Sequence, residues 1–382
     1  MNPSKNRNKK CVSLILILAL GLALLSGCGG AADPTDSAGG ETEGVEWDFA
    51  AAWQALDGDT VMLTVNGVDV TWDGCYYWLA NLLMGVDPSS IPSWKGAVGN
   101  GSNYTYEEYF RMLAEEYAAQ FAVMESMAAA AGSSLTAGDQ EKLEENWDLE
   151  VETYGDGSEE SFLAYLDSLC LSRAYYDTIN RAVVLNQRRF ADTYGARGEN
   201  VSTADVEQFI ADQGYSLCLR IHFGATDPDG ETRTEGELEE KRLELEGYLA
   251  ELQPLAGTET VTESFRALME EHTEDTDALG STGYLISPSE TEDTALIEAV
   301  NALEPYEMTV ADTADGVDLI LRLPLTPDTV VGTNADGETL DMHYYMAAWL
   351  DDNTLTEALE ARSVSYSTAW EELDFDALFP LG

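Results

Sequence analysis

The spacing of apolar residues changes at Tyr215, and this change limits the possible folds more than any other feature of the sequence. From about residue 72 to residue 213, apolar residues recur mostly at helical spacing. After Tyr215 two kinds of residue alternate: Leu217, Leu219, Ile221 and Phe223 are apolar, and Cys218, Arg220 and His222 lie between them. Such alternation predicts a half-buried β-strand. We therefore expect an α+β protein in which a mostly helical region is joined to a small sheet.

Strand and helix signals then follow one another closely through residues 215–325. The clearest predicted elements are a strand at 217–223, helices at 238–252, 265–269 and 296–303, and a strand at 317–323. Pro254 and Pro324 mark two of their ends, because proline cannot continue either kind of hydrogen-bonded ladder. With two further short strands, the order β-α-α-β-α-β-β predicts a small α+β sheet domain.

The flanking regions are predicted to be mainly helical, apart from one hairpin. Asn66-Gly67 lies between two β-branched runs and favours a type I′ turn, so residues 61–71 are predicted as a β-hairpin. Thr105 and Glu108 have the spacing of a helix capping box. The other predicted elements are helices at 137–154, 158–169, 176–190, 202–214 and 342–359, a short strand at 363–366 and an amphipathic piece at 370–379.

The first 27 residues have the order of an export signal. Basic residues at 5–10 precede an apolar stretch from Val12 to Leu25, and Leu25-Ser26-Gly27-Cys28 resembles a bacterial lipobox. We expect a signal peptide at 1–27, lipid on Cys28, and a flexible polar tether at 28–45. The protein would then be extracytoplasmic and anchored to the outer face of a bacterial plasma membrane. A plain secretory peptide with a chance Cys28 is the alternative.

Charge excludes one large class of function. The chain has 71 acidic and 19 basic residues and a formal net charge of −52. Four of the basic residues lie in the leader, so the mature chain has 15 and a charge of −56. Binding to nucleic acid needs dense Lys and Arg, so no nucleic-acid partner is expected. The same charge argues against electrostatic docking on anionic lipid.

Cysteine spacing and the absence of known motifs predict no cofactor and no metal. Cys75, Cys170 and Cys218 fall in apolar patterns and lack zinc-site spacing, so we expect buried free thiols. The sequence also has no phosphate-binding glycine loop and no hydrolase or metalloprotease motif.

Four stretches within 215–325 together resemble the parvulin (PpiC-type) peptidyl-prolyl isomerase domain. They are Leu219–Phe223, Leu268–Asp275, Gly283–Leu285 with Leu296–Leu303, and Thr313–Arg322. The flanks resemble those of the PrsA- and SurA-type foldases, in which N-terminal helices and a C-terminal segment form one chaperone domain around the isomerase. The resemblance implies a helical SurA-like domain at 46–214, a parvulin-like domain at 215–325, and a segment at 326–382 that packs back on the helical domain.

The resemblance also implies a set of site positions, most of which have changed. The family uses two neighbouring His on adjacent strands, an Asp or Cys, a Ser or Thr, and a Met/Phe pocket. Asp275 and Thr313 match the Asp/Cys and Ser/Thr positions, Arg220 and Asp318 stand at the His positions, and Glu292 and Leu296 stand at the Met and Phe positions. His222 is an alternative for the first His, although an exposed place on the strand is its simpler interpretation.

These replacements predict a degenerate active site. We expect Arg220 and Asp318 to form an ion pair across the strands, and isomerase activity to be weak or lost, because Arg does not release a proton near neutral pH. The leading hypothesis is an anchored foldase or chaperone that binds unfolded secreted polypeptides through apolar grooves of the helical domain. The simplest interpretation of the aromatic stripe at 106–121 is helix core, and the alternative is that part of it lines such a groove. The alternatives are an active isomerase with a rearranged site, and a solute-binding or surface lipoprotein.

Overall fold

The structure is a computed structural model that describes residues 47–99, 102–276, 282–334 and 337–381. The predicted leader, the tether and Cys28 lie outside these residues. The chain divides into two compact units. Within the described residues, one unit contains 194–350 and is called here the sheet unit. The other contains 47–193 with 351–381 and is called the helical unit. The predicted α+β class is confirmed, with many helices and small antiparallel sheets.

The helical unit is built on a hairpin followed by long helices. Asn66 and Gly67 have φ angles of 51° and 87°, which confirms the predicted type I′ turn. A third strand joins from the far end of the chain, giving the sheet order β2-β1-β9. The elements are α2 (Phe49–Trp53), β1 (Val61–Val65), β2 (Val68–Thr71), α3 (Trp72–Met84), α4 (Tyr106–Ala131), α5 (Ala137–Tyr154), α6 (Glu159–Ser168), α7 (Arg173–Tyr194), β9 (Val364–Tyr366), α13 (Thr368–Glu371) and α14 (Phe375–Leu378).

Local sequence signals explain where the helices of this unit begin and end. The capping box of Thr105 and Glu108 is present at the start of α4, and Gly132, with φ of 75°, ends that helix. The predicted amphipathic piece at 370–379 consists of two short helices. The Asp374 carboxylate accepts backbone N–H groups and starts α14 as a separate helix.

An aromatic cluster closes the core of the helical unit around Trp94. The Trp94 side chain is fully buried, and its Nε1–H donates to the carbonyl oxygen of Phe379 at 2.7 Å. Phe110 and Phe375 meet the same ring edge-on, with ring centroids at 6.0 and 5.2 Å. Residues far apart in sequence therefore share one small piece of core.

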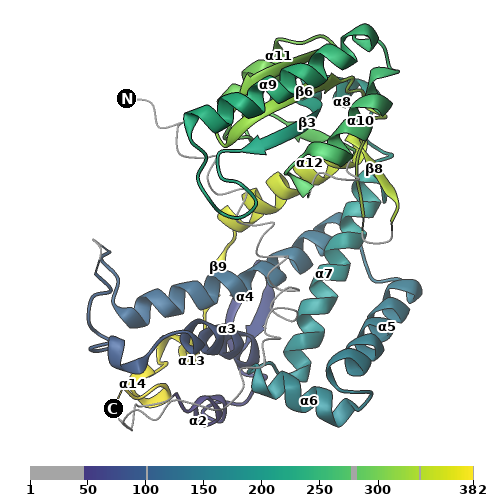
Figure 1. Ribbon diagram of the computed structural model, residues 1–382. Helices are drawn as coiled ribbons and strands as arrows, with labels where there is room; N and C mark the ends of the chain where they lie inside the picture. The colour runs from purple at the N-terminus through teal and green to yellow at the C-terminus, as the bar shows by residue number, and fades with distance from the viewer. Residues whose placement is uncertain (1–46, 100–101, 277–281, 335–336, 382) are drawn as a thin grey trace, which may run out of the picture. The chain divides into compact units, whose positions relative to one another are not determined.

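From β3 to β6 the sheet unit has the order β-α-α-β-α-β-β that the sequence predicts. Its elements are α8 (Thr203–Gln213), β3 (Ser216–Gly224), α9 (Glu235–Leu252), α10 (Val261–His272), β4 (Tyr284–Ile286), α11 (Thr294–Asn301), β5 (Met308–Asp312), β6 (Gly316–Leu323), β7 (Val330–Thr333), β8 (Thr339–Asp341) and the first half of α12 (Met342–Glu360). Four strands form an antiparallel sheet in the order β4-β3-β6-β5 (Figure 1).

Both faces of this sheet are covered. Helices α9 and α10 pack on the face that carries Leu219 and Leu321, and α11 packs on the face that carries Cys218 and Ile320 (Figure 1). The prediction that β3 is half-buried is therefore wrong. Alternation correctly separated its two faces, but α11 and a network of polar side chains bury the second face as well.

The boundaries between the units fall at residues 194 and 350, outside the 215–325 range that the sequence suggested for the sheet domain. Helix α8 belongs to the sheet unit because Phe209 packs against Tyr215 and Trp349, with ring centroids 5.2 Å apart in each pair. The β7–β8 hairpin, which the sequence did not predict, also lies in this unit.

None of the helices in the described part of the chain combines the length and apolarity that a membrane crossing requires.

Candidate functional site

The central residues of the candidate site face each other across strands β3 and β6. His222 lies directly opposite Asp318 in the strand register, and its Nδ1 is 3.0 Å from Oδ1 of Asp318. Asp318 is fully buried and His222 is only 8% exposed. The simpler interpretation of His222 as an exposed residue is therefore wrong. The turn at Thr273 and Glu274 covers this end of β3, with Glu274 donating its N–H to the His222 carbonyl oxygen at 2.9 Å.

Thr313 completes the environment of the buried carboxylate. It stands just before β6, where its N–H donates to the carbonyl oxygen of Gly316. Its hydroxyl donates to Oδ2 of Asp318, while Oδ1 of Asp318 faces the His222 ring. Both oxygens of Asp318 therefore have partners, as a buried carboxylate requires.

Arg220 connects this pair to Asp275. Its Nη1 lies 3.8 Å from Oδ1 of Asp318, so the predicted ion pair exists as a long contact. Its closer partner is Asp275, with 2.9 Å between Nη2 and Oδ2. The Asp275 carboxylate also accepts the Tyr284 hydroxyl, and the Arg220 guanidinium lies 4.7 Å from the centre of the Tyr284 ring. Asp275 is thus a partly buried member of an ionic network.

These contacts shift the pKa values of the site residues. Burial lowers the pKa of His222, but the hydrogen bond and charge of Asp318 outweigh burial, and the pKa is raised above its usual value. Burial raises the pKa of Asp275, but hydrogen bonds from Tyr284 and Arg220 outweigh it, and the pKa is lowered. The network therefore favours a protonated His222 beside ionised Asp275.

A cavity of about 640 Å³ opens beside this network, and the two remaining predicted positions, Glu292 and Leu296, line it. Leu296 is buried in its wall, whereas Glu292 is exposed at its rim. The carboxylate of Glu292 therefore keeps its water, and no burial penalty arises. The lining residues that matter here are Arg220, Tyr284, Ile286, Glu292, Leu296 and Asp315. The sequence did not single out Tyr284 as a site residue, although it lies in the Gly283–Leu285 stretch, and it gave no signal for Asp315.

The site does not suit a metal ion. Ligand atoms of His222, Asp315 and Asp318 lie within 4.8 Å of one another, which is a spacing that could hold a cation. However, both oxygens of Asp318 already accept hydrogen bonds. The Arg220 guanidinium also lies 3.8 Å from Asp318 and 4.0 Å from Asp315, where its charge would repel a cation. We assign no metal site to this cluster.

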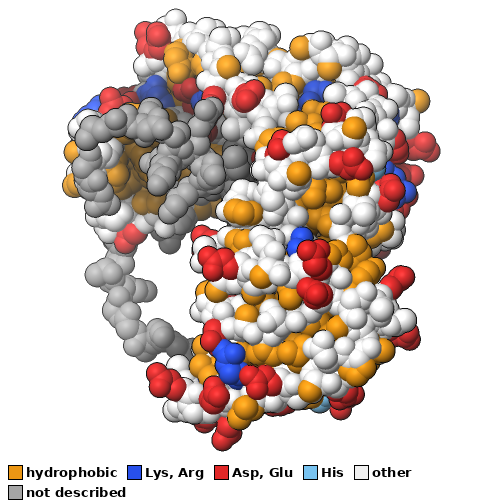
Figure 2. Space-filling model, turned by 90° about the horizontal axis from the view of Figure 1, so that it is seen from above, with side chains coloured by type: hydrophobic (Ala, Val, Ile, Leu, Met, Phe, Trp, Pro, Cys, Tyr) orange, Lys and Arg blue, Asp and Glu red, His pale blue; other side chains and the backbone are white. Residues whose placement is uncertain are grey.

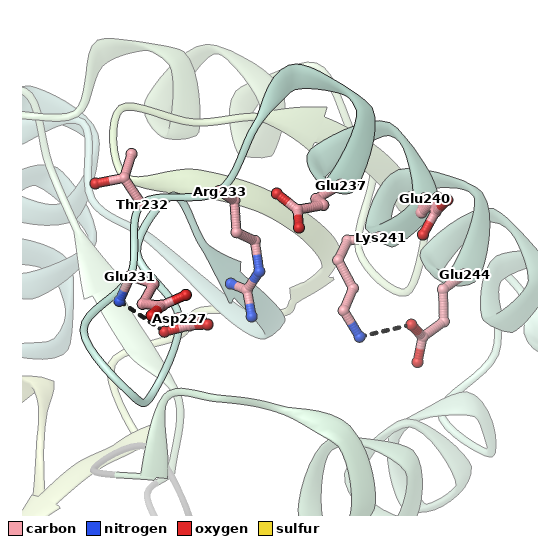
Figure 3. Close-up of a pocket in the computed structure, with 8 residues that line it drawn as sticks. All are labelled: Asp227, Glu231, Thr232, Arg233, Glu237, Glu240, Lys241 and Glu244. Carbon is pink, nitrogen blue, oxygen red and sulfur yellow. Dashed lines mark hydrogen bonds and ion pairs between the residues drawn. The ribbon is translucent and has the colours of Figure 1, made fainter.

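A second, strongly charged cavity of about 310 Å³ lies between the 227–233 loop and α9 (Figure 3). Arg233 points into it from the loop while binding both oxygens of Glu274 at 2.8 and 2.6 Å. Glu274 also accepts the Gly224 N–H at 3.0 Å, so this pair holds the end of β3 in place. The other charged lining residues are Asp227, Glu231, Glu237, Glu240, Lys241 and Glu244.

The raised pKa of His222 predicts that the sheet unit loses stability as the pH rises through neutrality. A proton bound more tightly in the folded state stabilises it fully below the ordinary His pKa of about 6.5, and this contribution disappears above the folded-state pKa. Thermal unfolding followed by circular dichroism at a series of pH values gives the slope of the melting temperature against pH. His222→Gln is expected to flatten it, and His272→Gln is the control. A His222→Gln slope equal to that of the unaltered chain would contradict the assignment.

Comparison with known proteins gives distant structural matches. PrsA from Bacillus subtilis is 16% identical, with a TM-score of 0.28, and the match covers 70% of this chain and 90% of that one. The peptidylprolyl isomerase PrsA from Bacillus anthracis is 14% identical, also with a TM-score of 0.28, and the match covers 65% and 94%. No family model and no curated protein matches the sequence. The chain thus has a distant structural similarity to PrsA foldases.

Proposed function

We propose that the mature chain is a lipid-anchored extracytoplasmic chaperone that binds unfolded polypeptides and has weak or no prolyl isomerase activity. The observation that supports this proposal is the polar network beside the 640 Å³ cavity, in which Arg220 contacts Asp275 and His222 contacts Asp318. By the family resemblance, Arg220 and Asp318 stand where the family has its two His. His222 and Thr313 both contact Asp318, and beside them Arg220 and Asp275 neutralise each other.

Catalysis of prolyl isomerisation requires an apolar seat for the ring and polar groups that favour the twisted amide. The planar amide is separated from that twisted state by a barrier of about 18–20 kcal/mol. In this site the carboxylates of Asp275 and Asp318 already hold the Arg220 guanidinium. The acidic side chain of Glu292 stands at the rim of the cavity. Both features work against a strong preference for the twisted amide of a proline.

The surface supports a role as a soluble binder of other chains. Figure 2 shows acidic side chains spread among apolar ones over the visible face, with basic side chains at few places. A charge of the same sign over the surface limits self-association, while apolar patches remain available to a client. Lipid on Cys28 would hold this binder where secreted chains emerge.

The proposal predicts a low prolyl turnover together with clear suppression of client aggregation. The full mature chain, without its lipid, is added to a protease-coupled assay with a proline peptide, where we expect a rate close to the uncatalysed one. Light scattering of a denatured model client should fall when the chain is present. His222→Ala should change neither result, because His222 is not expected to carry catalysis.

Each alternative function gives a different outcome. Strong turnover that His222→Ala abolishes would establish an active isomerase with a rearranged site. Unchanged client aggregation, with a large thermal shift on adding a small solute, would favour a solute-binding lipoprotein. Either result would overturn the proposed function.

A further inference from the structure

The helical unit contains a groove that follows the whole length of strand β2. The cavity measures about 300 Å³, which is within the range of ligand sites in proteins. Strand β2, helix α4 and helix α7 all line the cavity, and the apolar lining side chains of α4 and α7 are called here the floor of the groove. The lining residues are Val68, Asp69, Val70, Thr71, Ala118, Phe121, Ala122, Glu125, Tyr175, Thr178 and Arg181.

Strand β2 presents an open edge to this groove. It pairs with β1 on one side and is the outermost strand in the order β2-β1-β9. The two-residue turn makes Val65 and Val68 the closing hydrogen-bonded pair, so the next residue, Asp69, belongs to a pair without ladder hydrogen bonds. Its N–H and C=O therefore point away from β1, and no backbone partner lies on that side among the described residues.

The floor of the groove is apolar and uneven. Ala118 and Ala122 are buried on α4, one turn apart, and their small side chains leave the space open. The larger rings of Phe121 and Tyr175 stand beside them in edge-on contact, with centroids 6.4 Å apart. Alternate side chains of an extended segment would reach such a floor, because successive residues of a strand point to opposite faces.

The rim favours a cationic segment. Asp69 is exposed, and Glu125 is 3.5 Å from the mostly exposed Arg181, which is the one basic residue among the lining residues. Two carboxylates against one guanidinium leave a net negative rim on a chain that is itself strongly acidic. Residues of the bound segment that point away from the floor would therefore be favoured when they are Lys or Arg.

We propose that this groove binds an extended segment of an unfolded polypeptide, with alternating apolar and basic residues, as an added strand beside β2. The inference rests on the proposed binding of unfolded polypeptides and assigns it a place and a mode. Backbone hydrogen bonds to Asp69 would supply affinity with little dependence on sequence, and the floor would select apolar side chains.

A pair of substitutions at Asp69 tests the backbone contact. Asp69→Pro removes the outward N–H, and proline is tolerated at an edge strand where that group faces away from the ladder. Asp69→Ala is the matched control, because it also loses the carboxylate but keeps the N–H. The probe is a fluorescein-labelled, proline-free peptide in which Val and Lys alternate, and fluorescence anisotropy measures its binding. We expect Asp69→Pro to bind about tenfold more weakly than Asp69→Ala.

Two further measurements do not depend on how Asp69→Pro folds. Thr178 is exposed at the groove and bonds only to its own helix, so Thr178→Trp should fill the groove and weaken peptide binding about tenfold, while Thr178→Ala should not. Hydrogen exchange should show the Asp69 amide becoming protected when the peptide is added to the unaltered chain.

The outcomes separate this inference from the proposed function. If the unaltered chain binds the peptide, but Thr178→Trp binds equally well and the Asp69 amide gains no protection, the groove is the wrong place and chaperone function stands. If the unaltered chain neither binds the peptide nor suppresses client aggregation, both proposals fall. Self-association that Thr178→Trp abolishes, without an effect on the peptide, would identify a second copy of the chain as the occupant and overturn the inference.

Discussion

Replacing Arg189 with methionine is expected to lower the free energy of unfolding of the helical unit by about 3–5 kcal/mol, because it leaves a buried carboxylate without its partner. Arg189 on α7 is 4% exposed and Asp351 on α12 is 9% exposed. Nη2 of Arg189 lies 2.8 Å from Oδ2 of Asp351 and 2.9 Å from the Asn186 side-chain oxygen. Burial raises the pKa of Asp351 despite this contact, so the carboxylate depends strongly on Arg189.

Urea denaturation followed by tryptophan fluorescence measures this loss well. Seven of the eight tryptophans lie in the helical unit, and only Trp349 lies in the sheet unit. The double variant Arg189→Met with Asp351→Leu should recover much of the loss, because an apolar pair can replace a buried ion pair. Arg181→Met, at an exposed ion pair, should cost less than about 1 kcal/mol. Equal losses for Arg189→Met and Arg181→Met would contradict the prediction.

Trp94→Ala should destabilise the same unit by about 3–5 kcal/mol, since it opens a cavity among the rings of Phe110, Phe375 and Phe379 and leaves a carbonyl oxygen without its donor. Circular dichroism is the appropriate probe, because the variant lacks one of the reporting tryptophans. The urea concentration at the midpoint of unfolding should be clearly lower for Trp94→Ala than for the unaltered chain.

Trp94→Phe separates packing from hydrogen bonding at this position. The smaller ring fills part of the space but cannot donate to the Phe379 carbonyl oxygen, and an unsatisfied buried acceptor costs about 1–3 kcal/mol. We therefore expect an intermediate stability. If Trp94→Ala were as stable as Trp94→Phe, the cluster would not be part of the rigid core.

Local sequence signals predicted most of the fold correctly. The Asn66-Gly67 turn, the Thr105 capping box and the alternation after Tyr215 each act over a few residues, so their consequences can be read without knowing the rest of the chain. The burial of both faces of β3 could not be predicted, because it depends on α11, which packs from about 75 residues further along the sequence. The β7–β8 hairpin was missed because its strands are only four and three residues long.

The site was predicted as a set of positions but not as a set of partners. Arg220, Asp275, Thr313 and Asp318 were singled out individually, and all four lie in one network. The sequence suggested Arg220 as the residue facing Asp318, whereas the strand register places His222 there. A shift of two residues along a strand keeps the same face, so alternation alone cannot distinguish the two residues. Tyr284 was not singled out because its role depends on its hydroxyl reaching Asp275 from another strand.

The sheet β2-β1-β9 has a consequence for the order in which the chain can fold. Strand β1 meets β2 across a two-residue turn, but its other neighbour follows only after the entire sheet unit, and Ser363 donates its N–H to the Asn66 side chain across 297 residues. A chain that folds while it is being synthesised from its N-terminus can complete the sheet unit while β1 still lacks this neighbour. Such distant pairing is slow. If the sheet unit folds early, the segment that separates β1 from β9 is a compact unit instead of a long flexible loop. Less conformational entropy is then lost when β9 pairs with β1.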